Sequence, residues 1–241
     1  MIEAIGLDAD DTLWENASLS LGASPLETFF RVTEAEFVAL LADHVEGDVT
    51  GRLYDVERRN LARYGFGIKG FMLSMVQTAV ELTDGRIDGH AIGRILELGR
   101  EMLAHPVTLI DGVGAALDAL AGRRLILITK GDLIDQERKI AASGLAERFE
   151  TVEILADKTP EAYARVLFRA GITPERFLMA GNSMKSDVLP VVDLGGHGVF
   201  VPHEMTWAAE HAEAAEHPRL HRLDGIAALP ALIERLERGD A

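Results

Sequence analysis

The chain has 241 residues, 48% of them hydrophobic, which is enough for one sizeable domain and a smaller one with buried cores. It carries 24 Lys and Arg against 39 Asp and Glu, and the net charge of −15 disfavours nucleic-acid backbones and anionic membranes as partners. The absence of cysteine excludes disulfides, thiol nucleophiles and cysteine-based zinc sites. There is no apolar run of the ~20 residues that cross a bilayer and no signal-peptide pattern, so we expect a cytoplasmic protein.

The first predicted element is a buried strand over residues 2–7, which are mostly apolar. Three carboxylates follow within four residues, Asp8, Asp10 and Asp11. Carboxylates crowded at the end of a buried strand repel one another and lose hydration, and a divalent cation would offset that cost. A helix cap explains Asp11 or Thr12 but not Asp8, which is still attached to the hydrophobic strand. We therefore expect Asp8 and Asp10 to project into a ligand-binding crevice at the sheet edge.

Residues 14–105 show helical periodicity and no convincing strand. Ser24 and Pro25 form a helix start, and a break is expected near Thr33. Further helices are predicted over residues 50–64, 71–82 and 92–103. This part of the chain is therefore expected to be an all-helical insertion.

From residue 106 the pattern changes to short apolar strands that alternate with helices. The strands are predicted over residues 125–128, 152–155, 177–180 and 198–201, and the helices over residues 113–120, 133–143, 161–170, 187–194 and 226–236. This alternation is typical of a parallel sheet with right-handed crossovers. We therefore predict a three-layer, Rossmann-like α/β core formed by residues 1–13 and 106–241, with residues 14–105 inserted as a helical cap domain.

Each of the first four strands of this core is followed by a distinctive polar group. These groups are, in chain order, Asp8 with Asp10, Thr129, Lys158, and Asn182 with Asp187. Taken singly, Thr129 ends a strand, Lys158 is a solvated charge and Asp187 caps a helix. A parallel sheet brings all of them to one edge, where they form an inventory for phosphoryl transfer.

At these positions the chain resembles the haloacid dehalogenase superfamily of aspartyl-phosphate hydrolases. The four matching motifs are Asp8 to Thr12, Leu127 to Gly131, Lys158 to Pro160, and Gly181 to Asp187. Each motif alone is weak, but four in the family's order, each at a predicted strand end, make the resemblance specific. It covers about residues 1–13 and 106–200.

The resemblance implies a catalytic role for three side chains. Asp8 would attack phosphorus and form an aspartyl-phosphate, since an ordinary aspartate with a pKa of about 3.9 is ionised at neutral pH. Asp10 would protonate the leaving oxygen and then activate the water that releases phosphate. Lys158 would offset the charge of nucleophile and phosphate. The phosphoryl oxygens would be held by the second motif, through Thr129, Lys130 and Gly131.

The resemblance also implies a Mg²⁺ site formed by Asp8, the backbone carbonyl of Asp10, Asn182 and Asp187. Two positions depart from the family's pattern. Position 11 is Asp where Gly is frequent, and position 182 is Asn where Asp is usual. An amide oxygen binds Mg²⁺ without contributing charge, so we predict weaker metal affinity rather than loss of the site.

The helical insertion resembles the family's cap, which closes over the site and selects the leaving group. Its glycine-rich stretch, residues 65–70, is expected to be a loop in which Lys69 contacts an anionic or hydroxylated substrate. A plain interhelical turn is an equally acceptable interpretation of that stretch.

The main hypothesis is a Mg²⁺-dependent phosphatase acting on a small phosphorylated metabolite, either a nucleotide or a sugar phosphate. A 2-haloacid dehalogenase would use the same aspartate, but that chemistry needs no proton donor at position 10. A phosphotransferase or mutase would pass the phosphoryl group to an acceptor other than water, and a non-catalytic binding protein would keep the fold without the reaction. The acidic surface is compatible with a monomer or a homodimer.

Overall fold

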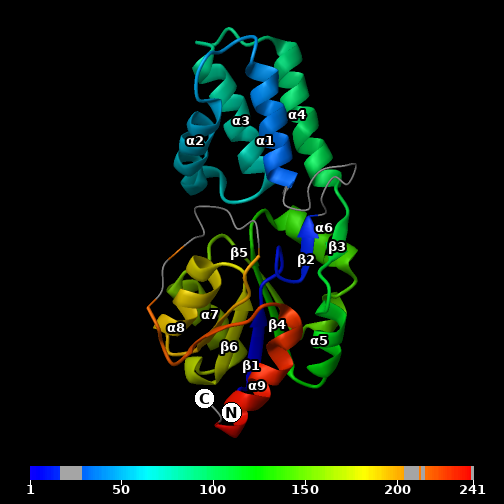
Figure 1. The fold of residues 1–241 in the computed structure, drawn as a ribbon, viewed down its shortest axis with the longest axis vertical. Helices are drawn as coiled ribbons and strands as arrows, with labels where there is room; N and C mark the ends of the chain where they lie inside the picture. The colour runs from blue at the N-terminus through cyan, green and yellow to red at the C-terminus, as the bar shows by residue number, and fades with distance from the viewer. Residues whose placement is uncertain (17–28, 204–211, 213–214, 240–241) are drawn as a thin grey trace. The chain divides into compact units, whose positions relative to one another are not determined.

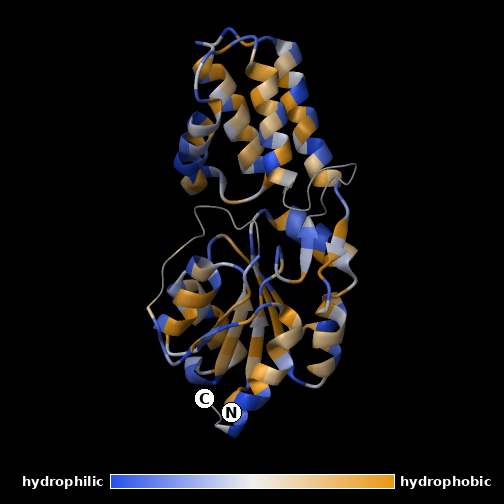
Figure 2. Cartoon of the chain, in the orientation of Figure 1, coloured by the Kyte–Doolittle hydropathy of each residue, from blue (hydrophilic) through white to orange (hydrophobic). Residues whose placement is uncertain are grey.

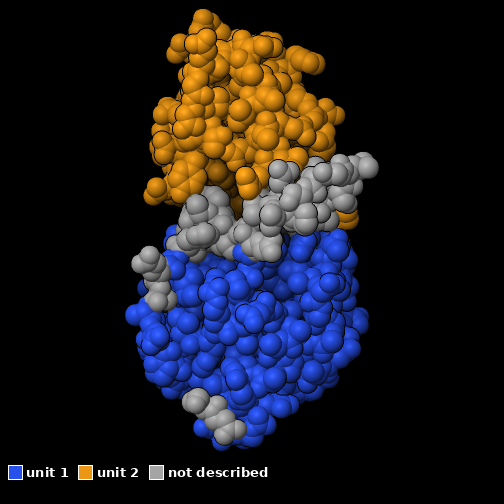
Figure 3. Space-filling model, viewed as in Figure 1, with its two compact units in different colours: residues 1–16, 107–130, 136–241 blue, residues 17–106, 131–135 orange. Residues whose placement is uncertain are grey.

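The computed structural model describes residues 1–16, 29–203, 212 and 215–239 (Figure 1). The chain divides into two compact units (Figure 3). Unit 1 comprises Met1–Asn16, Val107–Lys130 and Gln136–Ala241, and unit 2 comprises Ala17–Pro106 and Gly131–Asp135. The predicted helix start at Ser24 and Pro25 lies outside the described residues.

The boundaries of the units differ from the predicted ones at three places, which are residues 14–16, Pro106 and residues 131–135. Residues 14–16 belong to unit 1, because β2 (Trp14–Asn16) pairs antiparallel with β3 (Val107–Leu109). Both strands have three residues, too short to leave a periodic pattern in the sequence. Residues 131–135 fall with unit 2, although they follow a strand of the core.

Unit 1 is built on a six-stranded parallel sheet, which confirms the predicted fold class. The strand order is β5 (Thr151–Leu155), β4 (Arg124–Lys130), β1 (Ala4–Leu7), β6 (Phe177–Gly181), β7 (His197–Phe200) and β8 (Leu220–Arg222). The chain builds outward from β1 to β5 and then returns to β6 on the other side of β1. The carboxyl end of β1 therefore lies at a topological switch point, where open α/β sheets bind ligands.

Alternate residues of the strands face two separate hydrophobic clusters, as the period of two requires. Ile5 and Leu7 face a cluster shared with α5 (Val113–Ala119), α6 (Leu133–Ser143) and α9 (Leu229–Arg238). Ala4 and Ile126 face a cluster shared with α7 (Pro160–Ala170) and α8 (Leu189–Asp193). Helices thus cover both faces of the sheet, and Figure 2 shows hydrophobic colours along the strands between them.

Unit 2 contains α1 (Phe29–Leu41), α2 (Val49–Tyr64), α3 (Ile68–Leu82) and α4 (Gly89–Ala104) around a hydrophobic core of its own. The predicted break near Thr33 is wrong, because α1 is continuous and Thr33 is buried within it. The predicted loop over residues 65–70 is too long, because α3 begins at Ile68 and Lys69 lies in its first turn. Among the described residues, the structure has no helix of the length and apolarity that would cross a membrane.

Two histidines on neighbouring strands form a hydrogen-bonded pair. The Nδ1 of His197 on β7 lies 3.0 Å from the Nε2 of His221 on β8, and the two rings are stacked. Burial, with the nearby charges of His221 and Arg219, lowers the pKa of His197 to about 4, and burial also lowers the pKa of His221. Between pH 6.5 and 4 the folded protein therefore binds fewer protons here than the unfolded chain.

The stability contributed by this pair is present above pH 6.5 and is lost as the pH falls toward 4. When the pH falls from 7.5 to 5, the free energy of unfolding of His197→Gln should therefore decrease less than that of the unchanged protein. The expected difference is ~1 kcal/mol after allowance for solvent screening. Urea unfolding at both pH values measures this difference. Exposed His90→Gln is the control, and an identical pH dependence in all three proteins would contradict the prediction.

Candidate active site

The first carboxylate is fixed where β1 ends. The backbone N–H of Asp8 donates to the carbonyl of Ala180 on β6, so Asp8 continues the sheet and its side chain is buried. The chain then turns sharply, and the N–H of Asp11 donates to the carbonyl of Trp14. Asp11 has a φ of 59°, in the left-handed region that glycine prefers and that aspartate tolerates better than most residues. Glycine would adopt this conformation with less strain than aspartate.

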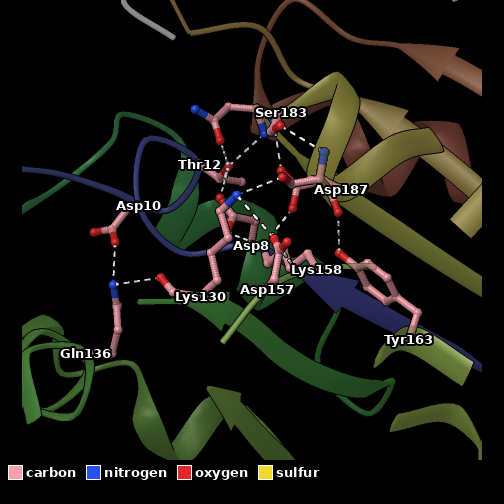
Figure 4. Close-up of polar contacts among 12 residues, drawn as sticks. Asp8, Asp10, Thr12, Lys130, Gln136, Asp157, Lys158, Tyr163, Ser183 and Asp187 are labelled. Atoms are coloured by element: carbon pink, nitrogen blue, oxygen red, sulfur yellow. Dashed lines mark hydrogen bonds and ion pairs between the residues drawn. The ribbon is translucent and has the colours of Figure 1, made fainter. Parts of the chain in front are cut away.

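One buried ammonium joins the carboxylates of two motifs (Figure 4). The Nζ of Lys158 lies 2.5 Å from Oδ1 of Asp8 and 2.6 Å from Oδ1 of Asp187. All three side chains are buried. Gly181, at the end of β6, is required here because the Asp187 carboxylate occupies the space that a Cβ at position 181 would fill. The structure therefore brings together Asp8, Lys158 and Asp187, which the sequence suggested would share one site.

The remaining oxygens of these two carboxylates also accept hydrogen bonds. The Thr12 hydroxyl donates to Oδ2 of Asp8 at 2.9 Å, and the N–H of Ser183 donates to Oδ2 of Asp187 at 2.9 Å. Asn182 lies beside them, and its N–H donates to the Thr12 hydroxyl oxygen at 3.1 Å. Thr12 thus connects the first motif to the fourth.

The electrostatics of the cluster follow from this burial. Burial raises the pKa of Asp8 to about 6. The positive charge of Lys158 acts to lower this pKa, and the negative charge of Asp187 acts to raise it. Burial alone would lower the pKa of Lys158, but Asp187 and Asp8 outweigh it and raise that pKa, so the lysine stays charged. Burial, with the charges of Asp10 and Asp8, raises the pKa of Asp11 to about 7.

The raised pKa of Asp8 has a consequence for the stability of the metal-free protein. From about pH 4 to 6 the folded state holds a proton that the unfolded chain has lost, so this carboxylate destabilises the fold as the pH rises. In the presence of a chelator, Asp8→Asn should therefore raise the free energy of unfolding by about 1–3 kcal/mol at pH 8 and by little at pH 4. Urea unfolding tests this, and an equal effect at both pH values would contradict it.

The side chain of Asp10 has different partners. It accepts hydrogen bonds from Trp14 Nε1 at 3.0 Å and Gln136 Nε2 at 2.8 Å, and it pairs with Lys139 Nζ at 3.2 Å. Burial would raise the pKa of Asp10, but Lys139 and these hydrogen bonds outweigh it and lower that pKa. Figure 4 shows the Asp10 carboxylate turned toward Gln136 rather than toward Lys158.

The predicted phosphate-binding residues lie at the carboxyl end of β4, which includes Thr129 and Lys130, with Gly131 directly after it. Thr129 is buried, and the Nζ of Lys130 donates to the Ser186 hydroxyl at 2.8 Å. Gly131 has a φ of 140°, which only glycine adopts readily, and it belongs to unit 2.

Lys69, the predicted substrate contact of the cap, forms an ion pair with Asp132 at 2.8 Å, and both residues belong to unit 2. Its contact with substrate stays a prediction.

The donors of the predicted metal site are all oxygens, as Mg²⁺ prefers. One lysine against two buried carboxylates leaves a net negative charge that a divalent cation would offset. Within the described residues, no three His, Asp or Glu side chains gather closely enough to hold a metal. A bound cation would therefore need Asn182 and the backbone carbonyl of Asp10 besides Asp8 and Asp187, and this set fits Mg²⁺.

Three residues of this site were not identified from the sequence. They are Trp14, Gln136 and Lys139, all of them buried. Gln136 and Lys139 are spaced as neighbours on a helix face, but polar residues at that spacing normally indicate an exposed face. The sequence therefore held no signal that they turn inward.

The parallel α/β fold and the four converging motifs define a hydrolase of the haloacid dehalogenase type. The sequence model of the haloacid dehalogenase-like hydrolases matches residues 2–193, and the chain belongs to this family.

Three comparisons show the range of its relatives. A haloacid dehalogenase-like family hydrolase from Xanthomonas campestris is 41% identical, with a TM-score of 0.85, over 99% of this chain and 93% of that one. A glyceraldehyde 3-phosphate phosphatase from Methanothermobacter thermautotrophicus is 26% identical over 225 residues, 88% of this chain and 92% of that protein. The 2-haloacid dehalogenase of Pseudomonas syringae pv. Tomato is 20% identical, with a TM-score of 0.64, over 98% of this chain and all of that one, and shares the fold.

Proposed function

We propose that this protein is a phosphomonoester hydrolase that acts on a small phosphorylated metabolite, a sugar phosphate or a nucleotide, through an aspartyl-phosphate. The observation that carries the proposal is the buried Lys158, which contacts both Asp8 and Asp187. A cation beside a buried carboxylate at a strand end would compensate the charge that builds up when that carboxylate meets a phosphate dianion.

The proposed reaction has two steps. In the first, which Asp10 enters in its protonated form, an Asp8 oxygen attacks phosphorus, the bond from phosphorus to the leaving oxygen breaks, and Asp10 gives its proton to that oxygen. In the second, Asp10 takes a proton from water as the water oxygen attacks phosphorus. The bond from phosphorus to Asp8 then breaks, which releases phosphate and restores both aspartates.

The second motif would hold the phosphoryl oxygens, through Thr129, Lys130 and the backbone N–H groups near Gly131. Mg²⁺, when bound by Asp8, Asp10, Asn182 and Asp187, would supply further positive charge to the phosphoryl oxygens. Because Asn182 contributes no charge, we expect Mg²⁺ affinity to be weaker than for an aspartate at that position.

Two further observations support a phosphatase over a dehalogenase. The chain has Asp10, a second carboxylate that a phosphatase needs for proton transfer and that displacement of a halide does not. The curated relative at 26% identity is a phosphatase of a three-carbon sugar phosphate, and it spans nearly the same length.

A substrate screen tests the proposal. Phosphate release is measured for sugar phosphates, including glyceraldehyde 3-phosphate, and for nucleoside monophosphates, with Mg²⁺ and with a chelator. Halide release from 2-haloacids is measured in parallel. We expect Mg²⁺-dependent phosphate release and no halide release. Halide release without Mg²⁺, together with no phosphate release, would identify the chain as a dehalogenase.

A further inference from the structure

The Asp10 carboxylate is surrounded by hydrogen-bond donors from two different elements. Trp14 of β2 donates to Oδ1 and Gln136 of α6 donates to Oδ2. The Nζ of Lys139, also on α6, lies 3.2 and 3.3 Å from the two oxygens. Both oxygens of Asp10 are therefore held at the same time, which fixes the rotation of the carboxylate as well as its position.

The two donors on α6 are buried, each with 4% of its surface exposed. A charged or polar side chain inside a protein loses its hydration, and an apolar residue of similar size is normally buried at lower cost. Packing therefore does not account for a lysine and a glutamine at these positions. Their contacts with Asp10 do.

The orientation of the Gln136 amide is also constrained. Its Nε2 donates to Asp10 and, at 3.3 Å, to the backbone carbonyl of Lys130 at the end of β4 (Figure 4). Its Oε1 is buried and has no hydrogen-bond partner among the described residues. An unsatisfied buried acceptor is unfavourable, so the amide orientation is determined by the two acceptors that its nitrogen serves.

We infer that Lys139 and Gln136 are positioning residues for Asp10, through which α6 sets how well Asp10 protonates the leaving oxygen. This inference rests on the proposed function, in which Asp10 carries that proton. Neither residue touches substrate. Without them, Asp10 would sample orientations in which its proton cannot reach the leaving oxygen, and misorientation of a catalytic group slows the step that depends on it.

Loss of Lys139 or Gln136 should affect two substrates of nearly the same shape, phenyl phosphate and p-nitrophenyl phosphate, to different extents. The phenolate released from phenyl phosphate has a basicity like that of tyrosine, with a pKa of about 10, and needs protonation as it leaves. The nitrophenolate released from p-nitrophenyl phosphate is a much weaker base and needs little protonation. Because kcat/KM covers only the steps through phosphoryl transfer to Asp8, it isolates the proton donation.

The test measures kcat/KM for both substrates in the full-length protein with Mg²⁺. Lys139→Met should lower kcat/KM for phenyl phosphate roughly tenfold or more, and for p-nitrophenyl phosphate only about twofold. Gln136→Leu should lower the ratio of kcat/KM for phenyl phosphate to kcat/KM for p-nitrophenyl phosphate, but by less than Lys139→Met does. Lys139→Arg keeps the charge and the donors and should restore this ratio. Arg165→Met, which removes a positive charge at an exposed position of α7, is the control.

Equal losses on both substrates would indicate a merely structural role and would overturn the inference, as would unchanged or increased rates on phenyl phosphate. If Lys139→Met does not fold, the Gln136→Leu and Lys139→Arg ratios decide the question. Failure of the unchanged protein to hydrolyse either ester, or any ester of the screen, would instead overturn the proposed function and this inference with it.

Discussion

Asp8→Asn is expected to reduce phosphate release by a factor on the order of 10³ or more, because an amide cannot attack phosphorus and form the covalent intermediate. The change is nearly isosteric, so the Thr12 hydroxyl and Lys158 still have a polar side chain at position 8 to contact. The loss should appear in kcat for every phosphomonoester that the unchanged protein hydrolyses, measured by direct detection of phosphate.

The same variant should remain folded. Without metal it should be more stable than the unchanged protein at pH 8, because a neutral amide replaces the buried carboxylate. Loss of activity with retained stability separates a chemical role from a structural one. Asp43→Asn, at an exposed position of unit 2, is the matched control and should keep full activity. Substantial phosphate release by Asp8→Asn would rule out Asp8 as the nucleophile.

Lys158→Met is expected to have the largest combined effect. It removes the cation that lies between Asp8 and Asp187 and leaves two buried carboxylates without a shared partner. Removing one member of a buried ion pair costs about 3–5 kcal/mol, so the free energy of unfolding should fall by that amount at neutral pH. Phosphate release should fall by at least about 10²-fold, because the electrostatic stabilisation of the transferring phosphoryl group is lost.

Denaturant unfolding and phosphate release measure these two effects independently. Lys185→Met, on the exposed side of the fourth motif, should stay within about 0.5 kcal/mol of the unchanged protein. The stability loss of Lys158→Met should shrink at low pH, where Asp8 becomes protonated and loses its charge. A loss no larger than that of Lys185→Met would contradict the assigned electrostatic role.

The order of elements and the parallel sheet could be predicted because both depend on local patterns. Apolar runs and turn residues repeat along residues 106–200 with the period of a β/α alternation, and a parallel sheet then brings the strand ends to one edge. The strand-end residues Asp8, Thr129, Lys158 and Asp187 were identifiable for the same reason. Short elements were less accessible, and β8 was missed because three residues, two of them His221 and Arg222, carry no strand pattern.

The side-chain partners required the tertiary structure. The sequence suggested one site for Asp8, Lys158 and Asp187 but not that a single ammonium would contact both carboxylates across separations of 150 and 29 residues. It assigned Asp10 to the same cluster, whereas the structure pairs its carboxylate with Lys139 and Gln136.

By itself, then, the sequence determined the fold, the edge of the sheet that carries the site and the kinds of group found there. Only the tertiary structure decided which donor meets which acceptor, and that α6 turns a lysine and a glutamine inward to hold Asp10. The physical reason is that strand and helix patterns follow from neighbouring residues. The partner of a buried charge is instead set by the packing of segments that lie far apart in the chain.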